Sequence, residues 1–125
     1  MNHVVEKTQG RIGIRMEAVG MGADYCLIIT GGDRPHLGAV ALSTPRPSLA
    51  DPEKISASTS VLTLVGHKED EVARKIARQF ASHLNCQVVA ACGVHLDNIT
   101  RDELAMMGQM LNELAEELLK KLRRS

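Results

Sequence analysis

Aromatic side chains are almost absent from this sequence. Its 125 residues include one tyrosine, Tyr25, one phenylalanine, Phe80, and no tryptophan. Lysine and arginine together number 15, as do aspartate and glutamate, so the formal net charge is zero. Proteins that bind nucleic acid combine an excess of positive charge with rings that stack on bases. We therefore expect no nucleic-acid partner.

Long apolar runs and paired cysteines are also lacking. No stretch approaches the roughly 20 apolar residues that cross a bilayer, and residues 1–7 hold no run of signal-peptide length. The cysteines, Cys26, Cys86 and Cys92, are odd in number, lie in apolar segments and lack the Cys-x-x-Cys spacing of zinc sites. We expect buried, reduced thiols in a cytoplasmic protein that has no contact with a membrane.

Several segments show the patterns of β-strands. In residues 11–18, Ile12, Ile14 and Met16 alternate with charged residues, which is typical of a half-buried strand. A short glycine-containing link follows and favours an antiparallel hairpin with the next strand. The predicted strands are residues 11–18, 25–30, 37–43, 57–65 and 86–92.

Two segments have the period of a helix. In residues 69–84, Val72, Ile76, Phe80 and Leu84 recur every four residues, and acidic residues occupy the first turn. The segment Thr100–Glu103 has the capping-box pattern that begins a helix. An apolar stripe follows it: Leu104, Met107, Leu111, Leu114, Leu118 and Leu122.

This order of elements, ββββ-α-β-α, predicts one α+β domain over residues 1–125. We expect a largely antiparallel sheet with two helices on one face. Met106, Met107 and Met110 widen the apolar surface of the second helix, which fits either core packing or an interface. A homodimer, formed through a sheet edge or the second helix, is a further expectation.

Three glycine-marked loops that carry histidine are the main functional signal. They read Gly31-Gly-Asp-Arg-Pro-His-Leu-Gly38, Gly66-His-Lys-Glu69 and Gly93-Val-His-Leu-Asp-Asn98. Such connections usually expose functional side chains. If the strands that they follow are neighbours in the sheet, the loops converge on one small pocket.

Each loop also has a plain structural interpretation. Gly31 and Gly32 let a ligand approach the backbone, and the planar guanidinium of Arg34 can bind an anion through two N–H groups. The structural interpretation is that the loop only connects two strands and that Arg34 is solvated. It has neither the phosphate-loop nor the dinucleotide-binding pattern. His67 and Lys68 precede a helix N-terminus, which attracts anions. The acidic residues that follow them already satisfy that end of the helix.

In the third loop, His95 and Asp97 are two residues apart. In an extended segment they point the same way, which suits a His–Asp dyad or metal ligation. Alternatively, the side chain of Asp97 or Asn98 makes an Asx-type turn that leads into the following helix. Together, His36, His67, His95 and Asp97 are candidates for a metal site, although their spacing matches no established motif. No nucleophile elbow is present.

At these loops the chain resembles the prenylated flavin chaperone-like family, named after the accessory protein of gallate decarboxylase. The resemblance covers nearly the whole domain and is carried by Thr30–Val40, Gly66–Glu69 and Cys92–Thr100. It implies a non-catalytic protein that binds prenylated flavin mononucleotide (FMN) or delivers it to a UbiD-like reversible decarboxylase. It also implies that Arg34 and Lys68 contact the phosphate.

The same resemblance implies that the Gly31-Gly32 backbone binds a polar flavin edge. His36, His67 and His95, with Asp97 beside them, would bond to ring heteroatoms. Two alternatives from other classes stay open. One is a small metal-dependent enzyme with a site at His36, His67 and His95, and the other is a structural interaction subunit whose loops are only turns.

Overall fold

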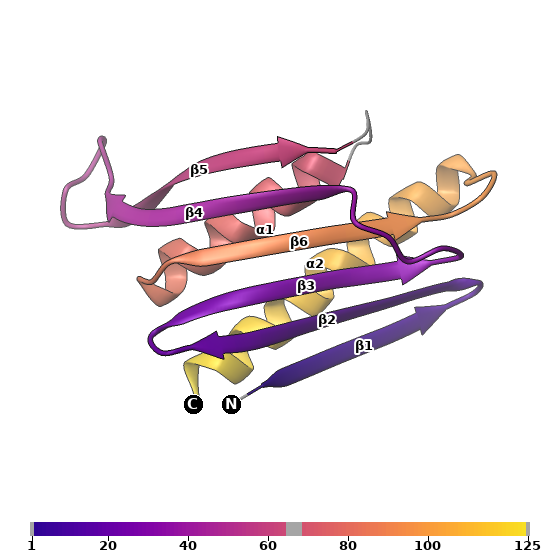
Figure 1. Ribbon diagram of the computed structural model, residues 1–125, viewed down its shortest axis with the longest axis horizontal. Coiled ribbons are helices and arrows are strands. Elements are labelled where there is room, and N and C mark those ends of the chain that lie inside the picture. Colours follow the sequence, from indigo (N-terminus) through magenta and orange to yellow (C-terminus); the bar gives the residue numbers. More distant parts are fainter. Residues whose placement is uncertain (1, 65–68, 125) are drawn as a thin grey trace.

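The computed structural model describes residues 2–64 and 69–124. Five strands are followed by a helix, a strand and a second helix (Figure 1). The elements are β1 (His3–Gln9), β2 (Ile12–Met21), β3 (Asp24–Gly32), β4 (Ala39–Pro47), β5 (Ile55–Thr63), α1 (Glu69–Leu84), β6 (Val88–His95) and α2 (Arg101–Arg123). The predicted α+β class is confirmed, and both helices begin close to their predicted positions.

One element, β1, was not predicted from the sequence, so five strands rather than four precede α1. β1 pairs antiparallel with β2 across a tight turn in which Gly10 has φ +60°. Val5 is the only fully buried residue of this strand. Because β1 forms an edge of the sheet, most of its side chains are polar, and the apolar alternation that identifies a strand is weak.

The sheet order is β1-β2-β3-β6-β4-β5. The predicted hairpin forms, since β2 and β3 pair antiparallel. β6 enters between β3 and β4, parallel to β3 and antiparallel to β4. Because β3 and β6 are parallel, both end at the same edge of the sheet, where Gly32 lies opposite His95. This topology places the first and third histidine loops side by side.

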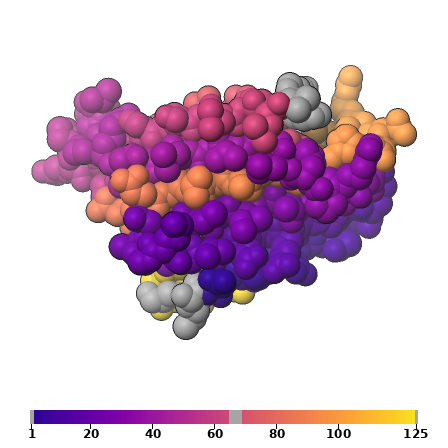
Figure 2. Space-filling view, in the orientation of Figure 1, coloured from indigo at the N-terminus to yellow at the C-terminus, as the bar shows by residue number. Residues whose placement is uncertain are grey.

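Both helices pack on the same face of the sheet, behind it in Figure 1. α1 contacts β4, β5 and β6, whereas α2 contacts β1 and β2. The core lies between the layers, with Phe80, Met16 and Leu27 fully buried. Figure 2 views the opposite face, which no helix covers. None of the helices in the described ranges is long and apolar enough to cross a membrane.

The predicted capping box of α2 is present. The Thr100 hydroxyl accepts a hydrogen bond from the Glu103 backbone N–H at 3.1 Å, and Glu103 Oε1 accepts one from the Thr100 N–H at 3.0 Å. The stripe below it is buried from Leu111 to Leu122, but Leu104 is 47 % exposed, and Met110, outside the predicted stripe, is fully buried. Leu104 therefore borders a surface feature rather than the core.

All three cysteines are free. Cys86 and Cys92 are buried, as predicted. Cys26 is only half-buried, so the expectation of burial was wrong for this residue. Its position on β3 directs it to the face of the sheet that lacks helices, since the neighbouring Leu27 faces the core.

Candidate functional site

The first and third histidine loops converge. The Asp33 N–H donates to the His95 carbonyl at 2.7 Å, and the Gly38 N–H donates to the Cys92 carbonyl at 2.9 Å. Of the second loop, Gly66, His67 and Lys68 lie outside the described residues. The residue that follows them, Glu69, begins α1 and lies within the same cluster. The structure thus brings together Arg34, His36, Glu69, His95 and Asp97.

Glycines allow this close approach of backbones. Gly32 has φ +80°, and a Cβ on it would lie 1.9 Å from the His95 carbonyl oxygen. A Cβ on Gly93 would lie 1.4 Å from the His36 carbonyl oxygen. At Gly31 the nearest backbone atom would be the Gly13 oxygen, at 2.4 Å. Packing between strands and loops thus explains these glycines, and a role of Gly31 and Gly32 in binding a flavin edge stays a prediction.

The predicted contact between His95 and Asp97 is present. His95 Nε2 lies 3.1 Å from Asp97 Oδ1, and Arg34 Nη2 contacts the same oxygen. Arg34 Nη2 also lies 3.5 Å from His95 Nε2. Because Nε2 cannot both donate and accept, the shorter contact favours an N–H that donates to Asp97. Arg34 and, to a smaller extent, His95 hold the pKa of Asp97 below its usual value.

The backbone turns at this loop, where Asn98 has φ 52°. The Asp97 side chain bonds to Arg34 and His95. The Asp97 backbone N–H, in contrast, donates to Asp33 Oδ2 at 3.0 Å. The His95–Asp97 dyad is therefore present, whereas no Asx-type turn closed by the Asp97 or Asn98 side chain is found among the hydrogen bonds of the described residues.

His36 faces Glu69 on the other side of the cluster. His36 Nδ1 lies 3.0 Å from the Arg34 carbonyl oxygen, and Nε2 lies 3.1 Å from Glu69 Oε1. A carbonyl oxygen only accepts, so Nδ1 carries a proton. The His36 and His95 rings meet edge to face, with centroids 6.0 Å apart.

An apolar cleft of about 300 Å³ adjoins these polar residues. It lies between the end of β6, the first turn of α1 and the beginning of α2. Burial raises the pKa of the Cys92 thiol in its wall to about 12, and the nearby Glu69 adds to this effect. Cys92 is therefore a neutral thiol at physiological pH. The lining residues are Glu69, Val72, Cys92, Val94, His95, Leu96, Ile99, Leu104, Met107 and Leu111.

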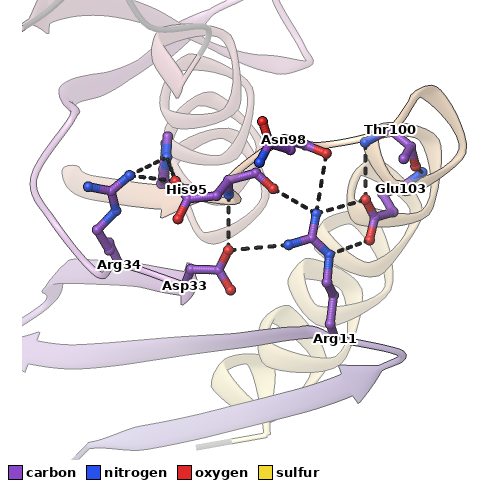
Figure 3. Close-up of polar contacts among 8 residues, drawn as sticks. Arg11, Asp33, Arg34, His95, Asn98, Thr100 and Glu103 are labelled. Atoms are coloured by element: carbon purple, nitrogen blue, oxygen red, sulfur yellow. Dashed lines mark hydrogen bonds and ion pairs between the residues drawn. The ribbon is translucent and has the colours of Figure 1, made fainter.

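A second polar cluster, which the sequence analysis missed, is centred on Arg11 (Figure 3). Arg11 Nε and Nη2 donate to the two carboxylate oxygens of Glu103 at 2.6 and 2.9 Å. Arg11 also donates to Asp33 Oδ2 at 3.3 Å and to the Asp97 carbonyl at 2.8 Å. It thus ties the β1–β2 turn to the first and third loops and to α2.

The Arg11 cluster positions the loops. The hydrogen bonds from Arg11 are the largest influence on Glu103 and lower its pKa to about 2. Asp33 accepts from both Arg11 and the Asp97 N–H, so it connects the first loop to the third. The partners of Arg11 are 22 to 92 residues away in sequence. The only local signal was its place beside Gly10 in a turn.

Metal ligation finds no support in the described parts of the chain. There, no group of three or more His, Cys, Asp or Glu side chains is arranged to hold a metal ion. His36 and His95 are close, but His67, the third histidine of that hypothesis, lies outside the described residues.

Comparison with known proteins identifies the family. Residues 8–123 match the family model described as the prenylated flavin chaperone LpdD-like domain. The chain belongs to this family. The resemblance noted at the three loops is thereby confirmed, and description of the family as a chaperone agrees with a non-catalytic role that involves a client protein.

Two individual proteins are similar to this chain. Protein LpdD of Lactiplantibacillus plantarum is 24 % identical over 114 residues, which cover 90 % of this chain and 80 % of that protein. A chain in the crystal structure of a novel chaperone complex for yeast 20S proteasome assembly matches with a TM-score of 0.56 and 14 % identity, over 96 % of both chains. The second likeness shows a shared fold alone.

Proposed function

We propose that this protein binds prenylated FMN at the cleft between β6, α1 and α2 and delivers it to a UbiD-like reversible decarboxylase. Membership of the prenylated flavin chaperone family supports the choice of ligand. The observation that carries the proposal is an apolar cleft with a polar cluster from two converging loops at its border. Ligand sites typically combine an apolar lining with a few polar groups that fix orientation.

The cleft suits the hydrocarbon part of this ligand. Its volume, about 300 Å³, is at the lower end of the range for small-molecule sites. A flavin nucleotide therefore fits only in part, and the remainder stays accessible to a client enzyme. The near absence of aromatic residues in the chain favours modest affinity, because ring stacking adds to binding. Partial burial and modest affinity both suit a carrier that releases its ligand.

The polar border suits the remainder of the ligand. The Arg34 side chain is 69 % exposed and presents further N–H donors beyond the one that contacts Asp97. We assign the phosphate to Arg34, with Lys68 as its predicted companion outside the described residues. His36 and His95 are placed to bond to polar flavin atoms, with Asp97 holding His95. His67 keeps this role as a prediction.

Native mass spectrometry with prenylated FMN tests the binding. We expect a one-to-one adduct with the unmodified protein. Leu104→Asp places a charge in the cleft wall and is expected to lower affinity at least about ten-fold. Leu49→Asp is the matched control, because Leu49 is 91 % exposed and lies outside the cleft. An unmodified protein that forms no adduct would refute the proposed binding.

Delivery is measured with a UbiD-like decarboxylase that lacks its cofactor. Addition of the protein loaded with prenylated FMN is expected to activate the enzyme faster than the same concentration of free cofactor. The Leu49→Asp variant should behave like the unmodified protein, and the Leu104→Asp variant should give little acceleration. Equal activation with and without the unmodified protein would contradict delivery.

A further inference from the structure

Glu69 is a buried carboxyl group with one unsatisfied oxygen. Its side chain is only 10 % exposed, and its Oε1 atom lies 3.1 Å from His36 Nε2. Oε2 is buried and has no hydrogen-bond partner in the structure as described. A buried polar atom without a partner destabilises a fold, and most such atoms in proteins are satisfied. This oxygen therefore requires an explanation.

The surrounding fold leaves space for this carboxyl group. A Cβ on Gly38 would lie 1.5 Å from Glu69 Oε2 and 3.2 Å from His36 Nε2. Gly38 thus allows the carboxyl group to lie against the backbone where the loop enters β4. An apolar side chain at position 69 would satisfy the core without leaving an unpaired oxygen. Instead, the absence of a side chain at Gly38 makes room for the Glu69 carboxyl group.

The same side chain forms part of the apolar cleft. Glu69 lines it together with Val72 of α1, Val94 of β6 and Leu111 of α2. The terminal torsion of a glutamate has a broad energy profile, so the carboxyl group turns at little cost. A turn about this torsion changes which carboxyl oxygen faces His36 and which faces Gly38, and it requires no movement of α1. Since none of the described residues donates to Oε2, a molecule in the cleft can supply the donor.

We infer that Glu69 selects the ligand by accepting a hydrogen bond from an N–H group at the edge of an apolar ring system. This inference rests on the proposed function. In its oxidised form the flavin ring has one such group, the imide N–H at N3, and the apolar lining would receive the adjoining ring. His36 holds the other carboxyl oxygen, so Glu69 is a specificity-determining residue and His36 positions it.

Titration of prenylated FMN into Glu69→Leu tests the inference. The control is Glu71→Leu, which removes a carboxylate from the same turn of α1 at an exposed position outside this cleft. We expect Glu69→Leu to weaken binding by about ten- to a hundred-fold, the effect of losing a hydrogen bond to a charged group. Glu71→Leu should retain affinity within about two-fold, since long-range charge at an exposed position is screened.

A ligand change gives the same test without altering the protein. The 3-methyl derivative of prenylated FMN lacks the imide N–H and should bind the unmodified protein about ten- to a hundred-fold more weakly. For Glu69→Leu, methylation should change affinity little. Equal losses with both proteins, or full affinity of Glu69→Leu for prenylated FMN, would overturn the inference and leave the proposed function standing. If the unmodified protein does not bind prenylated FMN, the proposed function itself fails.

Discussion

The two polar clusters beside the histidine loops differ in how completely they are hydrogen bonded. The Arg11 cluster is exposed, and the Arg11 guanidinium contacts Glu103, Asp33 and the third-loop backbone. In the other cluster, where His36 contacts Glu69, the Glu69 carboxyl group is buried, and one of its oxygens has no partner among the described residues. A network that positions loops requires that its polar groups satisfy one another's hydrogen bonds. A buried polar atom without a partner beside a cleft, in contrast, suits ligand recognition. Arg11 thus holds the loops in place, whereas Glu69 is the residue to which we have assigned ligand recognition.

The largest expected effect concerns the close approach of Gly93 to the His36 backbone, which brings the first and third loops together. Gly93→Ala would place a Cβ 1.4 Å from the His36 carbonyl oxygen, which belongs to backbone and cannot turn away. We expect the free energy of unfolding in urea to fall by about 3 kcal/mol, at the upper end for overpacking. Both clusters should be lost together.

Gly108→Ala is the control for this substitution. A Cβ there meets nothing within 4 Å, and Gly108 lies inside α2. Alanine is favoured over glycine in a helix by about 1 kcal/mol, so this variant should be more stable than the unmodified protein. A Gly93→Ala variant of normal stability would show that the two loops do not need this approach.

A smaller effect, of opposite sign, is expected at Glu69. Glu69→Leu removes the unsatisfied oxygen and should raise the free energy of unfolding without ligand by about 1 kcal/mol. Urea unfolding of the unliganded proteins measures this. A fall in stability would mean that Glu69 supports the fold, and the contrast between the two clusters would then disappear.

The smallest expected effect concerns the Arg11 cluster and pH. The pKa of Glu103 is about 2 in the folded protein, below its usual 4.5. As the pH falls, the Glu103 carboxylate is protonated in the unfolded chain before it is protonated in the folded protein. The contribution of Glu103 to stability is therefore complete above about pH 5 and is lost as pH falls toward 2. Thermal unfolding between pH 6 and 3, as approximate limits, measures the slope.

Arg11→Met sharpens this measurement, because it removes the partner that lowers the pKa of Glu103 most. The variant should lose less stability on acidification than the unmodified protein does. If the two proteins have the same dependence on pH, the Arg11–Glu103 pair contributes nothing to folding in solution.

Periodicity predicted every helix and strand except β1, but it did not predict which strands are neighbours in the sheet. The spacing of Val72, Ile76, Phe80 and Leu84 identified α1, and the Thr100–Glu103 pattern identified the beginning of α2. Periodicity also indicates which face of a strand is buried. It does not say which strands pair, so the insertion of β6 between β3 and β4 came only from the structure.

The candidate site was also predicted only in part. Short glycine loops marked His36, His95 and Asp97, and these residues do lie together. Arg11 was missed because its contacts join residues far apart in sequence, for which local spacing gives no signal. Leu104 was placed in the apolar stripe of the second helix, and such a stripe has the same pattern whether it lines a core or, as at Leu104, a cleft.

The most direct test of the account is the ratio of the dissociation constants of FMN and prenylated FMN for the unmodified protein. The prenyl-derived carbons are the main difference between the two ligands, and burying each carbon contributes roughly 0.8 kcal/mol. If the apolar cleft receives about two of these carbons, prenylated FMN should bind about ten-fold more tightly or better. Equal dissociation constants for the two flavins would contradict the assignment of the cleft to the prenylated ring.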